Sequence, residues 1–184
     1  MSDYDRRRIP VYLQIDANRI NSSGRLEYMN TLEKWHKDKV ITIKMSQPAQ
    51  DEAAHGNSAR ARKAYGVIFT ETECHTPKEK QLCKGIECVL FPQGALTQSQ
   101  KNDVKIVFNA TKYGCILVTN DGGSRRQPGG ILGNREKLKQ LGVEVLTDEE
   151  TVARIIQLIQ DRDIREREEA KITGQPLPEW VGRD

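Results

Sequence analysis

The feature that most constrains the fold is an alternation of short strand-like segments with longer amphipathic ones. Apolar, β-branched runs predict strands at 11–15, 40–45, 67–69, 115–119 and 143–146. Helical periodicity predicts helices at 25–37, 48–66, 98–114 and 135–141, and a further helix that opens with a capping box at Thr147 and Glu150. Strands and helices that alternate in this way form α/β domains. We therefore expect a three-layer α/β/α sandwich with a mainly parallel central sheet of four to five strands.

Three segments depart from the alternation. Residues 71–97 predict an insertion with a short helix near 78–84, followed by a hairpin or an extended segment, and residues 120–134 predict a loop in which Asn134 caps the next helix. After residue 160 the sequence becomes highly charged and then rich in Pro and Gly. We expect one domain at 8–160 with an insertion around 71–97, and a solvated helical extension with a C-terminal tail at 161–184.

The composition indicates a soluble globular chain. Of its 184 residues, 36% are hydrophobic and 30% are charged, and the formal net charge of +3 permits a nucleic-acid partner without requiring one. No segment has the apolar length of a membrane span, and the arginines at 6–8 are not followed by the apolar core of a signal peptide. We expect a cytoplasmic protein. The four cysteines contain no C-x-x-C pair, which favours ordinary thiols over zinc, and Cys115 is expected to be buried in a strand.

Four acidic residues are expected at one edge of the sheet. Asp16 and Asp121 follow predicted strands, Asp103 is expected in the first turn of the helix before the fourth strand, and Glu52 opens the helix after the second. Ligands bind at the carboxyl ends of parallel strands, so these side chains should converge. Each has a structural alternative: a helix cap for Asp16 and Asp103, a turn for Asp121, and a helix-dipole partner for Glu52.

A carboxylate cluster has a specific chemistry. Like charges repel unless a cation neutralises them, and hard oxygen ligands suit Mg²⁺ or Mn²⁺. Such an ion activates water and stabilises the charge that develops on a phosphate under attack. The cluster therefore predicts metal-dependent phosphoryl chemistry.

The same residues lie in a pattern that resembles the PIN domain, from about residue 9 to 159. The matching stretches are "IDAN", "QDEAA", "NDVKIVFNATKYGCILVTND" and "VEVLTDEETV". PIN-domain proteins are α/β metal-dependent ribonucleases and include many toxins of bacterial toxin–antitoxin pairs. The resemblance implies an acidic set of Asp16, Glu52, Asp103 and Asp121, with Asp16, Asp103 and Asp121 as ligands of Mg²⁺ or Mn²⁺. It also implies supporting roles for Asn18 and Thr119.

The assignment of Glu52 has alternatives, because Asp51 is adjacent and Glu71 or Glu73 could take the role. In place of an aromatic residue that often follows the last aspartate of the family, this chain has "GGSRR". Arg125 and Arg126 in that stretch are expected to contact RNA phosphates. Arg60, Arg62 and Lys63, on the helix that Glu52 opens, either do the same or form a solvated face.

The resemblance implies an RNA substrate, and it leaves open an antitoxin or other protein partner and a homodimer. Two alternatives remain: a related NYN-type nuclease, which also has an Asp-x-Asn strand end, and a catalytically silent module that binds RNA or protein. A receiver domain phosphorylated on aspartate is disfavoured, because the third strand and its end, "VIFTETE", contain no aspartate.

Overall fold

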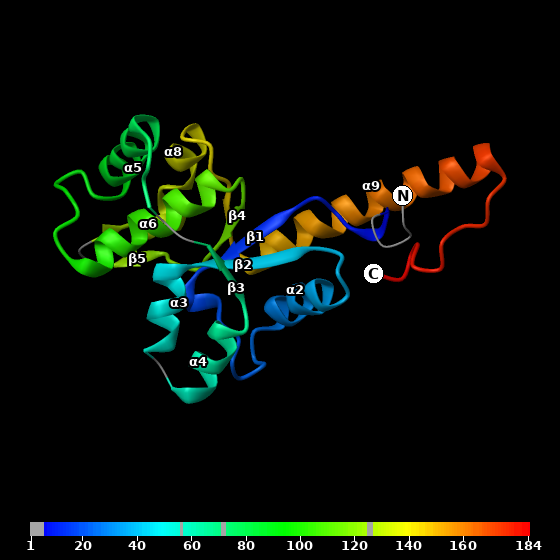
Figure 1. Ribbon diagram of the computed structural model, residues 1–184, viewed down its shortest axis with the longest axis horizontal. Helices are drawn as coiled ribbons and strands as arrows, with labels where there is room; N and C mark the ends of the chain where they lie inside the picture. Colours follow the sequence, from blue (N-terminus) through cyan, green and yellow to red (C-terminus); the bar gives the residue numbers. More distant parts are fainter. Residues whose placement is uncertain (1–5, 56, 71–72, 125–126) are drawn as a thin grey trace.

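A computed structural model describes residues 6–55, 57–70, 73–124 and 127–184 of the chain. It contains a central sheet of five parallel strands with helices on both faces (Figure 1), as the alternation predicts. The strand order is β3-β2-β1-β4-β7. The strands are β1 (Tyr12–Ile15), β2 (Thr42–Ser46), β3 (Ile68–Thr70), β4 (Ile116–Val118) and β7 (Val145–Leu146).

The two faces of the sheet are covered by different helices. Helices α2 (Glu27–Lys37) and α9 (Asp148–Thr173) pack against each other, and they contact β2 and β7. Helix α6 (Gln98–Lys112) packs on the face that carries Gln14, whose side-chain amide donates a 2.8 Å hydrogen bond to the carbonyl of Ile106. The sheet and these helices enclose a continuous core that includes Leu13, Met45 and Phe108, none of which is exposed to solvent.

The expected helix at 48–66 is wrong in its length, because the structure contains two helices there. Helix α3 (Gln47–Ala54) ends at His55, and α4 (Ser58–Tyr65) begins after Asn57. The side chain of Asn57 accepts a 2.9 Å hydrogen bond from the backbone N–H of Arg60, which is the bond of an N-cap. The basic residues of this region therefore lie on a different helix from Glu52.

Of the two alternatives for the second part of the 71–97 insertion, the hairpin is wrong, because its described residues contain a helix and no strand pair. Thr76 and Glu79 form a capping box that opens α5 (Pro77–Leu90), and this helix continues beyond the predicted end at residue 84. It packs on α6, and its Ile86 is fully buried in the core. Burial of this apolar face against α6 explains why the segment remains helical.

The expected loop at 120–134 contains regular structure. Strands β5 (Gly123–Ser124) and β6 (Gln127–Pro128) pair antiparallel, and the short helix α7 (Gly130–Gly133) follows. Asn134 occupies the N-cap position of α8 (Arg135–Gln140) but makes no capping bond, because its side chain donates instead to the carbonyl of Gly130.

The C-terminal segment folds back along α9 (Figure 1). Arg162, Asp163 and Glu166 of α9 are buried, so the expectation of a solvated extension is wrong for this part of the helix. Arg162 donates hydrogen bonds to the carbonyl of Arg7 and to the carboxylate of Asp184. Helix α9 crosses residue 160 without a break, and the division at that residue remains a prediction. No helix within the described ranges, α9 included, is both long and apolar enough to cross a bilayer.

Candidate active site

The predicted acids meet between β1 and β4, where the order in which the chain adds strands to the sheet reverses. The chain builds β1, β2 and β3 outward on one side and then places β4 on the other side of β1. Ligands of open α/β sheets bind at such a switch point, outside the carboxyl ends of the strands. Ile15 pairs with Val118 in the parallel ladder, so Asp16 and Thr119 both follow directly at this edge.

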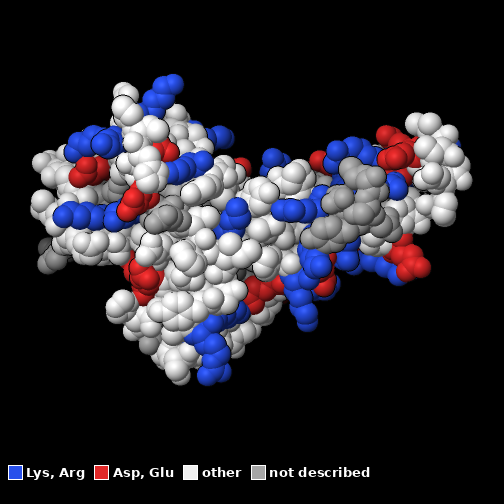
Figure 2. Space-filling model, in the orientation of Figure 1, with Lys and Arg blue, Asp and Glu red and all other residues white. Residues whose placement is uncertain are grey.

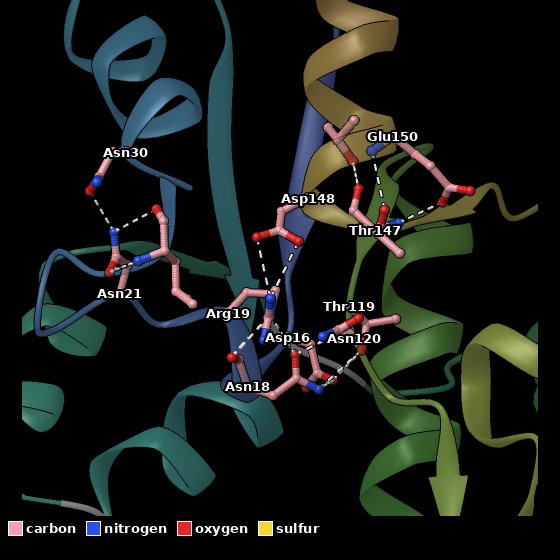
Figure 3. Close-up of polar contacts among 12 residues, drawn as sticks. Asp16, Asn18, Arg19, Asn21, Asn30, Thr119, Asn120, Thr147, Asp148 and Glu150 are labelled. Atoms are coloured by element: carbon pink, nitrogen blue, oxygen red, sulfur yellow. Dashed lines mark hydrogen bonds and ion pairs between the residues drawn. The ribbon is translucent and has the colours of Figure 1, made fainter. Parts of the chain in front are cut away.

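Asp16 is held by hydrogen bonds to both of its carboxylate oxygens, and Figure 3 shows those that Asn18 and Thr119 donate. Oδ1 accepts a 2.6 Å bond from the backbone N–H of Ala17, so Asp16 does cap the short 3₁₀ helix η1 (Ala17–Arg19). Oδ2 accepts 2.7 Å bonds from the amide of Asn18 and from the hydroxyl of Thr119. The helix-cap interpretation is therefore true of one oxygen, while the other is bonded to the two predicted supporting residues.

Asp121 lies in a cradle of backbone groups. Its Oδ1 accepts a hydrogen bond from the N–H of Gly123, and its Oδ2 accepts one of 2.8 Å from the N–H of Ile131. Gly130 makes the close approach possible: it has a positive φ of 54°, and a Cβ at this position would lie 2.5 Å from Oδ2 of Asp121. The hairpin and α7 thus fix the direction of this carboxylate. Sequence reasoning missed Gly130, for which "PGG" was the only signal.

Glu52 and Asp103 come from two helices on the same side of the site. Asp103 lies in the second turn of α6 and not in the first, because Thr97 and Gln100 form the capping box of that helix. A capping role for Asp103 is thereby excluded. Glu52, in α3, accepts a 2.9 Å hydrogen bond from the amide of Asn102, which ties it to the residue beside Asp103.

One surface hollow of about 590 Å³ contains all four acids. We call it the acidic hollow; its lining is Asp16, Ala17, Asn18, Glu52, His55, Arg60, Ser99, Asp103 and Asp121. Neither Asp51 nor Glu73 belongs to it, which favours Glu52 among the described candidates. Glu71, Arg125 and Arg126 lie outside the described residues.

Two basic residues, Arg60 and His55, line the acidic hollow and could contact an anionic ligand. Arg60 donates a 2.6 Å hydrogen bond to the carbonyl of Ala17, which holds its guanidinium at the residue that follows Asp16. His55 lies at the C-terminal end of α3. Lys63 is directed elsewhere, since it pairs with Glu33 at 2.6 Å.

The electrostatics of the acidic hollow match a cluster of like charges. Burial raises the pKa of Asp16, and the charges of Glu52 and Asp121 raise it further, while the bonds from Thr119 and Ala17 act in the opposite direction. Burial also raises the pKa of Asp103 to about 7, with added contributions from the charges of Asp16, Asp121 and Glu52. The four acids therefore interact with one another across the hollow.

The chemistry of this donor set fits a hard divalent cation. Carboxylate oxygens are the ligands that Mg²⁺ and Mn²⁺ prefer, and a cation would relieve the repulsion that raises these pKa values. Within the described ranges, no group of three or more His, Cys, Asp or Glu side chains already has an arrangement that could hold a metal ion. The acids thus share one hollow without a preformed ligand shell.

The side chain of Arg19 connects the acidic hollow to α9 (Figure 3). Arg19 donates through Nε to the side-chain oxygen of Asn18 at 3.1 Å. Its Nη1 lies 3.3 Å from both carboxylate oxygens of Asp148, at the start of α9. Arg19 was not predicted, although it follows "DAN" directly in the sequence.

The fold and the site together define an α/β domain with a carboxylate cluster at the switch point of a five-stranded parallel sheet. No family model and no curated protein matches this sequence. Among solved structures, the chain is similar to one in the crystal structure of VapBC2 from Rickettsia felis bound to a DNA fragment from their promoter. The identity is 15%, the TM-score is 0.48, and the match covers 74% of this chain and 98% of that one. A likeness at this level carries no inference about activity.

Proposed function

We propose that this chain is a divalent-metal-dependent ribonuclease of PIN type, which hydrolyses RNA phosphodiester bonds in the acidic hollow. The observation that supports this most directly is the convergence of Asp16, Glu52, Asp103 and Asp121 from four separate parts of the chain. Burial and the neighbouring carboxylates both raise the pKa of Asp103, so keeping these acids charged in the hollow is unfavourable. A bound cation would offset this repulsion, and a metal site would explain why the acids are kept together.

Asp16, Asp103 and Asp121 would hold Mg²⁺ or Mn²⁺, and Glu52 would complete the acidic set. The ion, when bound, activates water and stabilises charge on the scissile phosphate. Asp103 is the most adjustable of the three proposed ligands, since Asp16 and Asp121 are already fixed by hydrogen bonds to both oxygens.

The remaining residues orient the acids and the substrate. Asn18 and Thr119 keep Asp16 in one rotamer, and preorganisation of this kind lowers the cost of reaching the reactive geometry. Arg60 is placed to contact an RNA phosphate at the rim of the hollow. Arg125 and Arg126 remain predicted RNA contacts, because they follow Asp121 closely in the sequence.

The partners of this activity remain predictions. RNA is the expected substrate, and an antitoxin or other protein partner and a homodimer depend on the family resemblance. A cytoplasmic location is a separate expectation, drawn from the apolar pattern of the sequence. An NYN-type nuclease would use the same chemistry. A catalytically silent module would bind RNA or protein without turnover.

A cleavage assay on end-labelled single-stranded RNA tests the proposal. The wild-type protein should cleave with Mg²⁺ or Mn²⁺ and not in EDTA. Asp103→Asn should reduce cleavage at least a hundredfold, because it removes a ligand while nearly keeping the shape of the side chain. Asp161→Asn is the matched control, since Asp161 is exposed on α9 and does not line the acidic hollow. Cleavage that persists undiminished in EDTA would contradict a metal mechanism.

Thermal unfolding gives a second readout that does not depend on activity. Preferential binding to the folded state should raise the melting temperature of the wild type in Mn²⁺, by the equivalent of about 2.7 kcal/mol when the ion is at a hundred times its Kd. Asp103→Asn should gain much less. RNA binding without either cleavage or stabilisation by metal would instead support the silent module.

A further inference from the structure

A second hollow lies at the opposite end of β1 from the acidic one. It has a volume of about 340 Å³, and its polar and charged lining comes from the segment before β1, from β1 and β2, and from the end of α2, while Ile41 and Ile68 supply an apolar part. Three of the residues are cations, Arg8, Lys39 and Lys44, and none of the described residues that line it is acidic. We call it the basic hollow. Figure 2 shows basic side chains where β1 and β2 lie in the middle of the view.

Two of these cations are held against one aromatic ring. Nζ of Lys44 lies 4.2 Å from the centre of the Tyr12 ring, and the guanidinium carbon of Arg8 lies 5.6 Å from it. Arg8 also donates a 3.2 Å hydrogen bond to the hydroxyl of Thr42 and a 3.3 Å bond to that of Tyr12. Cation–π contacts and these hydrogen bonds therefore fix two like charges beside each other.

The third cation has an unusual backbone. Lys39 has a positive φ of 64°, the only one outside glycine among the described residues. The left-handed conformation costs a non-glycine residue roughly 1–2 kcal/mol. It follows the end of α2, where glycine or asparagine is the usual choice, so the chain places a lysine at a position that disfavours it.

We propose that the basic hollow binds the phosphate backbone of single-stranded RNA, as a second contact for the substrate of the acidic hollow; the proposal rests on the proposed function. Three converging cations without a lining carboxylate complement a polyanion. Tyr12, partly exposed between them, adds the aromatic surface that single-strand sites combine with basic residues. An acidic protein surface is the alternative occupant, and the aromatic ring at the centre favours RNA over it.

The two hollows lie near opposite ends of β1. Side chains alternate along a strand, so Tyr12, Gln14 and Asp16 belong to the same face of the sheet. At about 3.3 Å per residue, Tyr12 and Asp16 are separated by roughly 13 Å. Helix α6 packs over Gln14 between them, so the RNA would pass around this helix.

Binding of a fluorescent single-stranded RNA in EDTA tests the basic hollow without cleavage. The double variant Arg8→Gln/Lys44→Gln should bind at least tenfold more weakly than the wild type at low salt. Its slope of log affinity against log salt should fall by roughly 1.4, because each lost phosphate contact contributes about 0.7 on single strands. The matched control is Lys84→Gln/Arg165→Gln, which removes the same net charge from exposed positions on α5 and α9. Melting temperatures of both doubles establish that each is folded.

The outcomes separate this proposal from the nuclease activity. If the wild type cleaves RNA with Mn²⁺ but the two doubles show equal salt slopes, the basic hollow is not an RNA contact, while the proposed function stands. If only the Arg8/Lys44 double loses affinity and the wild type does not cleave, the hollow binds RNA, while the nuclease proposal fails. The assignment of RNA is overturned if the wild type binds no RNA, or if it binds RNA no more tightly than inorganic phosphate. An acidic protein surface would then be the occupant.

Discussion

The hydroxyl of Thr119 donates a 2.7 Å hydrogen bond to Oδ2 of Asp16, and this bond joins the ends of β4 and β1 at the switch point of the sheet. The same oxygen of Thr119 accepts bonds from the backbone N–H of Asp121 and from the amide of Asn18. Thr119 is fully buried, so a single hydroxyl connects three residues of the acidic hollow.

Thr119→Val should therefore weaken both stability and activity. The substitution keeps the shape but removes one of the three hydrogen bonds to Asp16 and leaves the N–H of Asp121 without its partner, which should lower the free energy of unfolding by about 1–3 kcal/mol. RNA cleavage should fall at least tenfold. Thr119→Ser retains the hydroxyl and should recover most of the activity. Denaturant unfolding and cleavage rates measure the two effects, and a fully active valine variant would contradict this role.

The pKa of Asp103 predicts how stability changes with pH. Folding raises this pKa from 3.8 to about 7, mainly through burial, so the folded state binds the proton more tightly than the unfolded state. The stability from this group is complete below pH 3.8 and is lost as the pH rises through about 7. In EDTA, Asp103→Asn should remove this loss and be more stable than the wild type at pH 8 by on the order of 1 kcal/mol.

Denaturant unfolding of both proteins at pH 5 and pH 8 checks the sign. The difference in stability between Asp103→Asn and the wild type should be larger at pH 8, where the wild-type carboxylate is charged. Two proteins with the same dependence on pH would show that folding does not raise the pKa of Asp103.

Arg19 should act as a positioning residue. It connects Asn18 to Asp148, so Arg19→Met should let Asn18, and through it Asp16, move away from the reactive geometry. We expect cleavage to fall about tenfold through kcat more than through KM, with metal binding retained. Arg25→Met, an exposed control, should not change the rate. A change in KM alone would indicate that Arg19 contacts RNA directly.

Gly130→Ala should disrupt the cradle of Asp121. The positive φ and the close approach to Oδ2 of Asp121 leave no room for a methyl group, so Asp121 must turn or the hairpin must shift. We expect loss of cleavage and a destabilisation of roughly 1–3 kcal/mol. Gly133→Ala is the control, because a Cβ there meets no atom within 4 Å. Equal activity of the two variants would show that the cradle does not position Asp121.

Arg162 should be important for stability and not for chemistry. It is buried, packs 4.5 Å from the ring centre of Trp180, and pairs with Asp163 and Asp184. Arg162→Met leaves these carboxylates without their shared cation, so unfolding should become easier by roughly 3–5 kcal/mol. The exposed Arg165→Met should change stability by much less. Cleavage per folded molecule should be unchanged, and a stable Arg162→Met would indicate that the C-terminal segment contributes little to the fold.

The sequence by itself determined the layers of the fold and the ends of the strands, because side-chain periodicity and capping are local. The parallel sheet, the capping box at Thr147 and Glu150, and the positions of Asp16 and Thr119 at strand ends all follow from neighbouring residues. Local patterns failed where burial decided the structure. Helix α5 extends beyond its predicted end because Ile86 and Leu90 pack into the core. Arg162 is buried because segments from both ends of the described chain enclose it.

Tertiary structure alone decided how the acidic residues are held. No pattern in the sequence shows that Asn102 binds Glu52, that Gly130 shapes the cradle of Asp121, or that Arg19 reaches Asp148. Likewise, Arg8 and Lys44 are far apart in the sequence and meet only because β1 and β2 pair in register. These contacts join residues from different elements, and their geometry depends on strand order and helix packing, which the local composition of the chain does not encode.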